Sequence, residues 1–181
     1  MGSGWIILDS NNTILLETQG RTHKWILSTR YELTAIMHAI LCAPKNQKIK
    51  IYNDSKATIN SIDSIRKQLD RQKNRARTWF KANNSSIISC IIDNLDSKNI
   101  DLDLIWVKGH EDNVGNNLVD RVTKEACNSC NNYITVSKAQ TACIVFRPMW
   151  DQHIIERNVR KFVRQVAETV EQTDWSLNKN H

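Results

Sequence analysis

The sequence predicts a mixed α/β fold in which a sheet is flanked by helices and a C-terminal extension adds short strands and one helix. Apolar side chains recur every three or four residues over 30–42, which is helical spacing, and a β-favouring run at 48–52 follows. Later, alternating residues at 105–107 give way to a second helical pattern. We therefore expect one α/β domain over residues 1–130, with residues 131–181 as the extension.

Each further element has its own local signal. An Asn11-Asn12 turn separates two short β-like runs, so we expect a hairpin at the start of the chain. Alternation and helical spacing then distinguish strands from helices along the rest of the domain. In chain order we expect strands at 5–8, 13–17 and 24–27, a helix at 30–42, a strand at 48–53, helices at 56–69 and 85–97, a strand at 101–107 and a helix at 116–129.

The extension combines two β-favouring runs, 133–136 and 142–146, with a helix predicted over 150–170 from its apolar spacing. The apolar face of such a helix is expected to pack against another apolar surface. The region also contains four residues that could in principle bind zinc, namely Cys127, Cys130, Cys143 and His153. Their spacing is loose, and two of the cysteines belong to helix and strand patterns, so we do not expect zinc.

Composition places the chain among globular proteins. Hydrophobic residues make up 40% and charged residues 24%. The chain opens without a secretory signal, and no apolar run approaches the ~20 residues of a membrane span. Five cysteines without such a signal indicate reduced thiols. We therefore expect an intracellular setting, cytoplasm or nucleus, and no membrane partner.

Positive charge is concentrated in one segment. The net charge is +6 and the pI is near 9.1. Between residues 64 and 84, seven basic residues accompany a single acidic one, and aromatic residues lie among them. This favours salt-dependent contacts with nucleic-acid phosphates through Lys73, Arg75 and Arg77, with Trp79 as an aromatic contact. The alternative is a solvated helix face whose aromatic residues turn towards the core.

One stretch combines a strand, a histidine loop and an aspartate on a helix. In residues 105–126, IWVKGHEDNVGNNLVDRVTKEA, His110 follows the strand and Asp120 lies in the first turns of the helix. The positive end of the helix dipole favours an ionised carboxylate there, which suits a divalent-metal ligand as well as simple dipole complementarity. This order of elements resembles the C-terminal catalytic half of ribonuclease H.

Two upstream segments extend the resemblance, which covers roughly residues 4–128. YNDSK is similar to the family's strand-end segment at Asp54, and STRYELTAIMHAI is similar to its first-helix segment at Glu32. Taken alone, an Asp before Ser is usually a helix cap and a Glu in a first turn is usually solvated. Three carboxylates in the family's order, together with a KGH loop, favour the active-site interpretation.

The resemblance implies a ribonuclease H fold and a metal-dependent endonuclease that cuts the RNA strand of RNA–DNA hybrids, as a host enzyme or a retroelement domain. It implies that Glu32, Asp54 and Asp120 hold Mg²⁺ or Mn²⁺, because hard cations prefer oxygen ligands. His110 would assist proton movement or product release.

The resemblance also implies contacts with the hybrid. Ser28 and Thr29 lie just before the helix-borne Glu, where the family contacts 2′-hydroxyl groups, although Asn is more usual there. The basic segment lies where some ribonucleases H carry a protrusion that grips the hybrid. The expected partner is therefore RNA–DNA hybrid or structured nucleic acid.

The family's first strand, with a carboxylate at its end, has no counterpart in the sequence. The chain opens on a segment like the family's second strand, and Asp9 lies at a turn. Either the given chain begins after the first strand or the natural protein has lost it. We therefore expect weak or absent cleavage. The alternative function is a non-catalytic nucleic-acid-binding module of the same fold, and a third interpretation is another nuclease or integrase of the superfamily.

A missing central strand would leave backbone groups of its neighbours without partners. The segment TACIVF at 141–146 is apolar on both faces, as a central strand must be. We predict that it fills the slot, either from the same chain or from a second copy in a strand-swapped homodimer, with the 150–170 helix packed over it.

Overall fold

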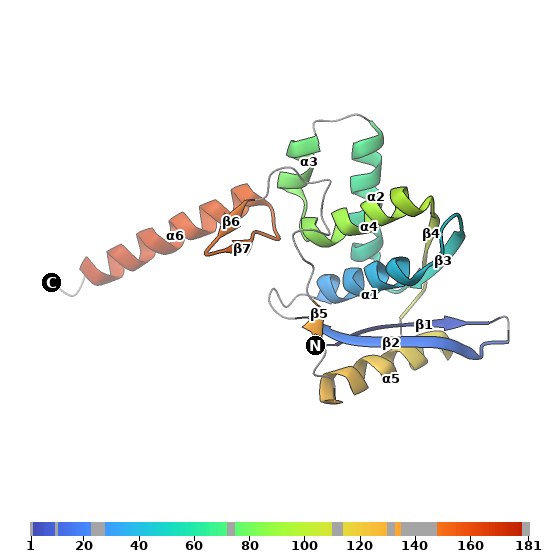
Figure 1. Ribbon diagram of the computed structural model, residues 1–181. Coiled ribbons are helices and arrows are strands. Elements are labelled where there is room, and N and C mark those ends of the chain that lie inside the picture. The colour runs from blue at the N-terminus through green and yellow to red at the C-terminus, as the bar shows by residue number, and fades with distance from the viewer. Residues whose placement is uncertain are drawn as a thin grey trace.

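The computed structural model describes residues 2–9, 11–22, 28–71, 75–109, 114–129, 133–134 and 148–178 (Figure 1). Within this part of the chain, the predicted mixed α/β fold is confirmed, with further strands and a helix towards the C-terminus. No helix among the described residues is both long enough and apolar enough to cross a membrane.

An antiparallel hairpin opens the chain, formed by β1 (Gly2–Leu8) and β2 (Ile14–Thr22). At its turn, Asp9 Oδ1 accepts hydrogen bonds from two backbone N–H groups, each at 2.8 Å. Asp9 is therefore a turn residue, as predicted. The short strand β5 (Tyr133–Ile134) pairs in parallel with the end of β2.

A separate sheet contains the parallel strands β3 (Lys48–Asn53) and β4 (Asp101–Trp106). The pairing is in register along its whole length, so the two strands end at the same edge. β1 and β3 belong to separate sheets, and no described strand pairs with both of them. The slot expected between them stays a prediction. The predicted strands at 24–27 and 142–146, including the segment proposed to fill the slot, lie outside the described residues.

The main core lies among helices α1 (Ser28–Cys42), α2 (Lys56–Asp70), α4 (Ser85–Lys98) and the short α3 (Arg75–Lys81). Apolar positions every three or four residues bring aliphatic side chains together, as predicted from their spacing. The largest fully buried side chains include Leu33, Ile40, Ile62, Ile87, Ile88 and Ile91.

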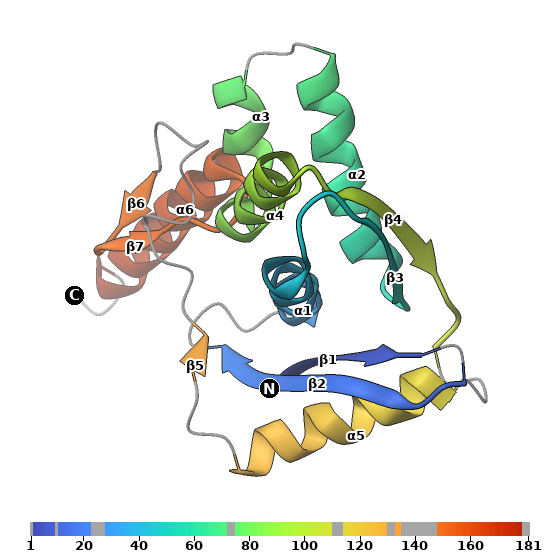
Figure 2. The same cartoon turned by 45° about the vertical axis from the view of Figure 1, so that its right-hand side comes forward.

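Helix α5 (Val114–Ser129) lies on the other face of the hairpin, so β1 and β2 run between α1 and α5 (Figure 2). Gly4 on β1 allows this close approach. A Cβ atom at Gly4 would lie 3.1 Å from Val122 Cγ1 and 3.2 Å from Thr123 Oγ1, which leaves little room for a side chain.

Lys98 stabilises the end of α1 from the last turn of α4. Its Nζ donates hydrogen bonds to the carbonyl oxygens of Ile40, Leu41 and Ala43, at 3.1, 2.6 and 3.0 Å. These carbonyls lie at the negative end of α1, so a cation there is favourable. The contact links the two helices that contribute most to the core.

The extension differs from its prediction at residue 150. A hairpin of β6 (Met149–Trp150) and β7 (His153–Ile154) precedes helix α6 (Val159–Asn178), so a helix beginning at Trp150 is wrong. Asp151 and Gln152 have φ values of 45° and 60°, which suit the two central residues of a tight hairpin turn.

Glu156 connects the extension to the core. Its carboxylate accepts hydrogen bonds from the backbone N–H of Ser86, at 3.2 Å, and from the Ser86 hydroxyl. It also pairs with Arg30 Nη1 at 3.3 Å, and the Glu156 side chain is 4% exposed. Asn84, at the N-cap of α4, makes no side-chain cap of its own, so Glu156 supplies the acceptor there.

Candidate active site

Asp54 follows β3 directly and lies at the start of α2. Ser55 is the N-cap of α2, and its Oγ accepts a hydrogen bond from Thr58 N at 3.3 Å. The chain therefore changes from strand to helix within two residues and leaves the Asp54 side chain exposed at the carboxyl end of the sheet. This is the position predicted from the strand-end motif.

Asn53 connects Asp54's strand to Glu32 on α1. The Asn53 Nδ2 group donates a 2.7 Å hydrogen bond to Glu32 Oε2, while Asn53 Oδ1 accepts one of 2.8 Å from Ser55 N. Both ends of the amide are thus used, which fixes the Glu32 carboxyl against the end of β3. The sequence analysis did not identify Asn53, although its position next to Asp54, on the opposite face of the strand, was a usable signal.

The pKa of Glu32 is affected by both of the other predicted carboxylates, Asp54 and Asp120. Burial raises the pKa of Glu32 above its ordinary value, the hydrogen bond from Asn53 lowers it, and the charges of Asp54 and Asp120 raise it. Asp120 lies exposed on α5, on the far side of the hairpin from α1. Asp54 and Asp120 therefore each lie close enough to Glu32 for their charges to act on it.

The backbone after β4 passes over Asp54. A Cβ atom at Gly109 would lie 2.9 Å from Asp54 Oδ2, so a larger residue there would displace the carboxylate. Trp106 Nε1 donates a 3.0 Å hydrogen bond to the Asp54 carbonyl, and Lys56 Nζ lies 4.0 Å from the centroid of the Trp106 ring. The Asp54 carboxylate thus lies against Gly109, and the Asp54 carbonyl is hydrogen-bonded to Trp106. His110, the next residue of this loop, lies outside the described residues.

The carboxylates fit a hard divalent cation by their chemistry, because Mg²⁺ and Mn²⁺ prefer oxygen ligands. Within the described ranges, none of the three forms an ion pair with Lys or Arg, so their charge is not compensated there. The same residues contain no group of three His, Cys, Asp or Glu side chains gathered closely enough to hold a metal ion. The described side chains of the site are therefore not gathered into a compact metal-binding cluster.

The predicted nucleic-acid contacts are divided between two places. Ser28 is exposed and Thr29 is half-buried in the first turn of α1, one turn from Glu32. Arg77 is exposed on α3, which also includes Arg75. Lys73 lies outside the described residues.

Trp79 requires a correction. Its side chain is 5% exposed and belongs to the main core, so its ring is not available to stack on a base. Helix α3 turns Thr78 and Trp79 inwards and Arg77 and Phe80 outwards. The alternative interpretation of this segment, with aromatic residues towards the core, is thus right for Trp79. Phe80, at 39% exposure, is the aromatic residue that faces solvent.

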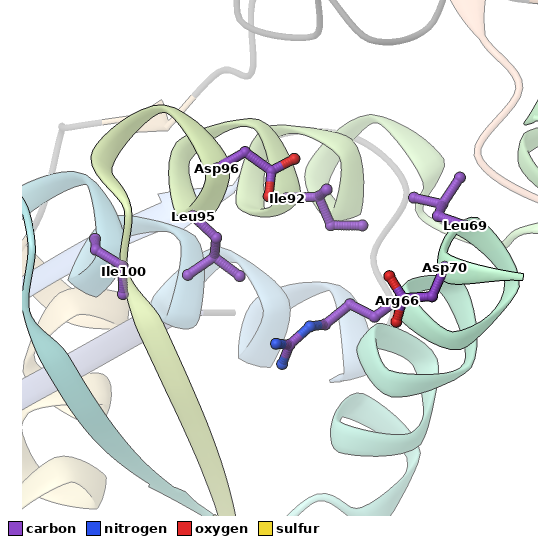
Figure 3. Close-up of a pocket in the computed structure, with 7 residues that line it drawn as sticks. All are labelled: Arg66, Leu69, Asp70, Ile92, Leu95, Asp96 and Ile100. Carbon is purple, nitrogen blue, oxygen red and sulfur yellow. The ribbon is translucent and has the colours of Figure 1, made fainter. Parts of the chain in front are cut away.

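A recess of about 280 Å³ lies elsewhere, between α2 and α4 (Figure 3). Arg66 lines it and donates a 3.4 Å hydrogen bond to the carbonyl of Leu102, near the start of β4. The recess is thus at the amino ends of β3 and β4, whereas Asp54 follows the carboxyl end of β3. It is separate from the carboxylate site. Of the four residues that could in principle bind zinc, Cys127, Cys130 and Cys143 belong to parts of the chain whose side chains are not described.

Comparisons with known proteins agree with this arrangement. The family model described as RNase H matches residues 4–128. Over 106 residues the chain is 30% identical to proteins named Ribonuclease H from Thermoanaerobacter sp. (strain X514) and Thermoanaerobacter pseudethanolicus, an alignment that covers 54% of this chain. The chain spans 63% of the length of these relatives. By the extent of the family match, this chain belongs to the ribonuclease H family.

Proposed function

We propose that the chain binds RNA–DNA hybrid and is a metal-dependent endonuclease domain for its RNA strand, with weak or absent cleavage by residues 1–181 on their own, since these residues contain no counterpart of the first family carboxylate. The observation that carries the proposal is the 2.7 Å hydrogen bond from Asn53 to Glu32, which holds the Glu32 carboxyl at the end of the strand that leads into Asp54. The charges of Asp54 and Asp120 both raise the pKa of Glu32. Buried or clustered carboxylates without cationic partners are typical of functional sites rather than of structural ion pairs.

Glu32, Asp54 and Asp120 would hold the metal ion. A bound Mg²⁺ or Mn²⁺ supplies an activated water and charge stabilisation for phosphodiester hydrolysis. Asn53 orients Glu32 through its 2.7 Å hydrogen bond, so that one carboxylate oxygen is fixed. Because Gly109 has no side chain, the backbone there can lie against Asp54 Oδ2 without a steric clash. In this proposal His110 moves a proton or promotes product release.

Hybrid binding would use two surfaces. Ser28 and Thr29 lie beside Glu32 at the start of α1, where hydroxyl groups can contact the minor groove of an A-form-like duplex. Arg75 and Arg77, with Lys73 upstream of α3, would contact phosphates and make binding salt-dependent. Selectivity for hybrid would then depend on shape and on 2′-hydroxyl groups rather than on base sequence.

Completion of the sheet belongs to the same proposal. The segment 141–146 would pair with the free edges of β1 and β3, from its own chain or from a second copy in a strand-swapped homodimer. Neither arrangement supplies the missing carboxylate.

The second candidate is a binding module that grips hybrid or structured RNA without cutting it. It is favoured by the open arrangement, since no three carboxylates among the described residues form a ready metal group. One experiment separates the two. Labelled hybrid, duplex RNA and duplex DNA are incubated with the chain in Mg²⁺ or Mn²⁺, beside Asp54→Asn. Hybrid cleavage that Asp54→Asn abolishes, with binding and fold retained, supports the enzyme. Hybrid binding without cleavage supports the module, and equal affinity for duplex DNA and hybrid at matched salt contradicts both.

A further inference from the structure

Helix α6 extends away from the core and carries a stripe of apolar side chains, part of which the described residues leave exposed. The helix extends outwards from the region of α3 (Figure 1). Near its start Phe162 packs against Trp150, with ring centroids 5.9 Å apart and planes at 71°. Beyond that contact, Val163 is 57% exposed and Val170 is 53% exposed. Val163 and Val170 are seven residues, or about two turns, apart, so both lie on the same side of α6.

The stripe has the spacing of a coiled coil. Its positions in the sequence are separated alternately by four and three residues, which is the heptad spacing that keeps one seam on the same side of a helix. Val is also well suited to such seams because its side chain is stiff and packs into the holes of a facing helix. The positions are Val159, Val163, Val166, Val170, Thr173 and Leu177.

Charge is segregated along the same helix. Along α6 the basic residues Arg160, Lys161 and Arg164 come first, and the acidic residues Glu168, Glu171 and Asp174 follow them. Two such helices side by side in parallel would bring like charges together. In the antiparallel arrangement, the basic part of each helix faces the acidic part of the other.

We propose that α6 pairs antiparallel with α6 of a second copy of this chain. In the register that matches the seam, Val166 lies against Val170 of the second copy, and Val163 lies against its Thr173. Beside the seam, Arg160 then faces Asp174 of the second copy, and the two Ala167 residues meet at the centre. Arg160 and Asp174 are both exposed, and neither has an ion-pair partner within residues 148–178.

The start of α6 is hydrogen-bonded to the core, so pairing of two α6 helices would join two whole chains. Asn158 Oδ1 accepts a hydrogen bond from Lys161 N at 3.3 Å at the start of α6, and Asn158 N donates to Asn83 Oδ1 at 3.1 Å beside α4. The helix is therefore tied to the core at its start. A paired α6 of 20 residues is a rod about 30 Å long, with one core at each end.

Sedimentation equilibrium of the full chain over a range of concentrations tests the proposal. The chain should form a dimer, and Val163→Glu combined with Val170→Glu should make it monomeric. The matched control, Gln172→Glu, adds a charge to α6 away from the seam and should leave the dimer intact. Because α6 projects from the core, urea unfolding of each variant should stay cooperative and close to that of the unmodified chain.

Charge reversal tests the antiparallel direction separately. Arg160→Glu alone, or Asp174→Lys alone, places like charges at two symmetric contacts and should weaken the dimer by about tenfold. The double variant Arg160→Glu/Asp174→Lys should restore it. A monomer at every concentration overturns the proposal. So does a dimer that survives the two seam substitutions, as a strand-swapped dimer would, or a double reversal that fails to restore affinity.

Discussion

Replacing Glu156 with glutamine is expected to lower the free energy of unfolding by about 3–5 kcal/mol, because it leaves a buried charge without its partner. The Arg30 and Glu156 side chains are 11% and 4% exposed, so Arg30 cannot recover hydration when the carboxylate is removed. Among the described residues, Arg30 Nε has no hydrogen-bond partner even before the substitution. The substitution keeps an acceptor for Ser86 and changes the volume little, so the loss reports the charge. Against a total stability of about 5–15 kcal/mol, it is large.

Urea unfolding of the full chain measures this loss. Glu168→Gln is the matched control, because its ion pair with Arg164 at 3.6 Å is exposed on α6 and surface pairs contribute little. Adding Arg30→Met to Glu156→Gln should recover part of the stability, since both charges are then absent from the buried site. A loss for Glu156→Gln no larger than that of the control, or a double variant less stable than either single one, would refute the reasoning.

Three further expectations follow from the same structure. Glu32→Gln should raise the free energy of unfolding near neutral pH, because ionising Glu32 at its raised pKa costs folded-state stability. This gain should shrink as the pH falls through the raised pKa, and it should vanish below the ordinary pKa of 4.5. Urea unfolding at several pH values measures it. Changing Lys73, Arg75 and Arg77 together to Ala should reduce the salt dependence of hybrid binding by up to about three phosphate contacts. If the slope of log affinity against log salt concentration is unchanged, the segment is a solvated helix face that does not contact the hybrid. A chain truncated after Asn132 should lose cooperative unfolding, since it lacks Glu156; a monomer that still unfolds cooperatively would show that the tail does not complete the core.

The elements predicted best were those with a strong local period. The strand at 48–53 was predicted at its observed bounds, and the helix at 30–42 was observed as Ser28–Cys42. In both cases the side chains that define the pattern are the ones that become buried, so the local signal and the tertiary contacts agree. Glu32 and Asp54 lie near the ends of these elements, which is why their places in the fold could be predicted.

The features that were missed depend on contacts between distant residues. Glu156 lies 70 residues from Ser86, and nothing in its local sequence marks it as a helix cap. The apolar pattern after Trp150 continues through the β6–β7 hairpin, whose turn is made by Asp151 and Gln152 without a glycine. Trp79 lies in a run of positive charge, but its burial is decided by which face of α3 meets the core.

Binding of Mn²⁺, followed by electron paramagnetic resonance, tests most directly whether Glu32, Asp54 and Asp120 form one metal site. The chain should bind the ion, and Glu32→Gln, Asp54→Asn and Asp120→Asn should each weaken binding because each removes a charged ligand. Asp103→Asn, an equally conservative change at an exposed position of β4, should bind as the unmodified chain does. Binding that all three site variants retain, or that Asp103→Asn weakens to the same degree, would contradict the assignment of the site.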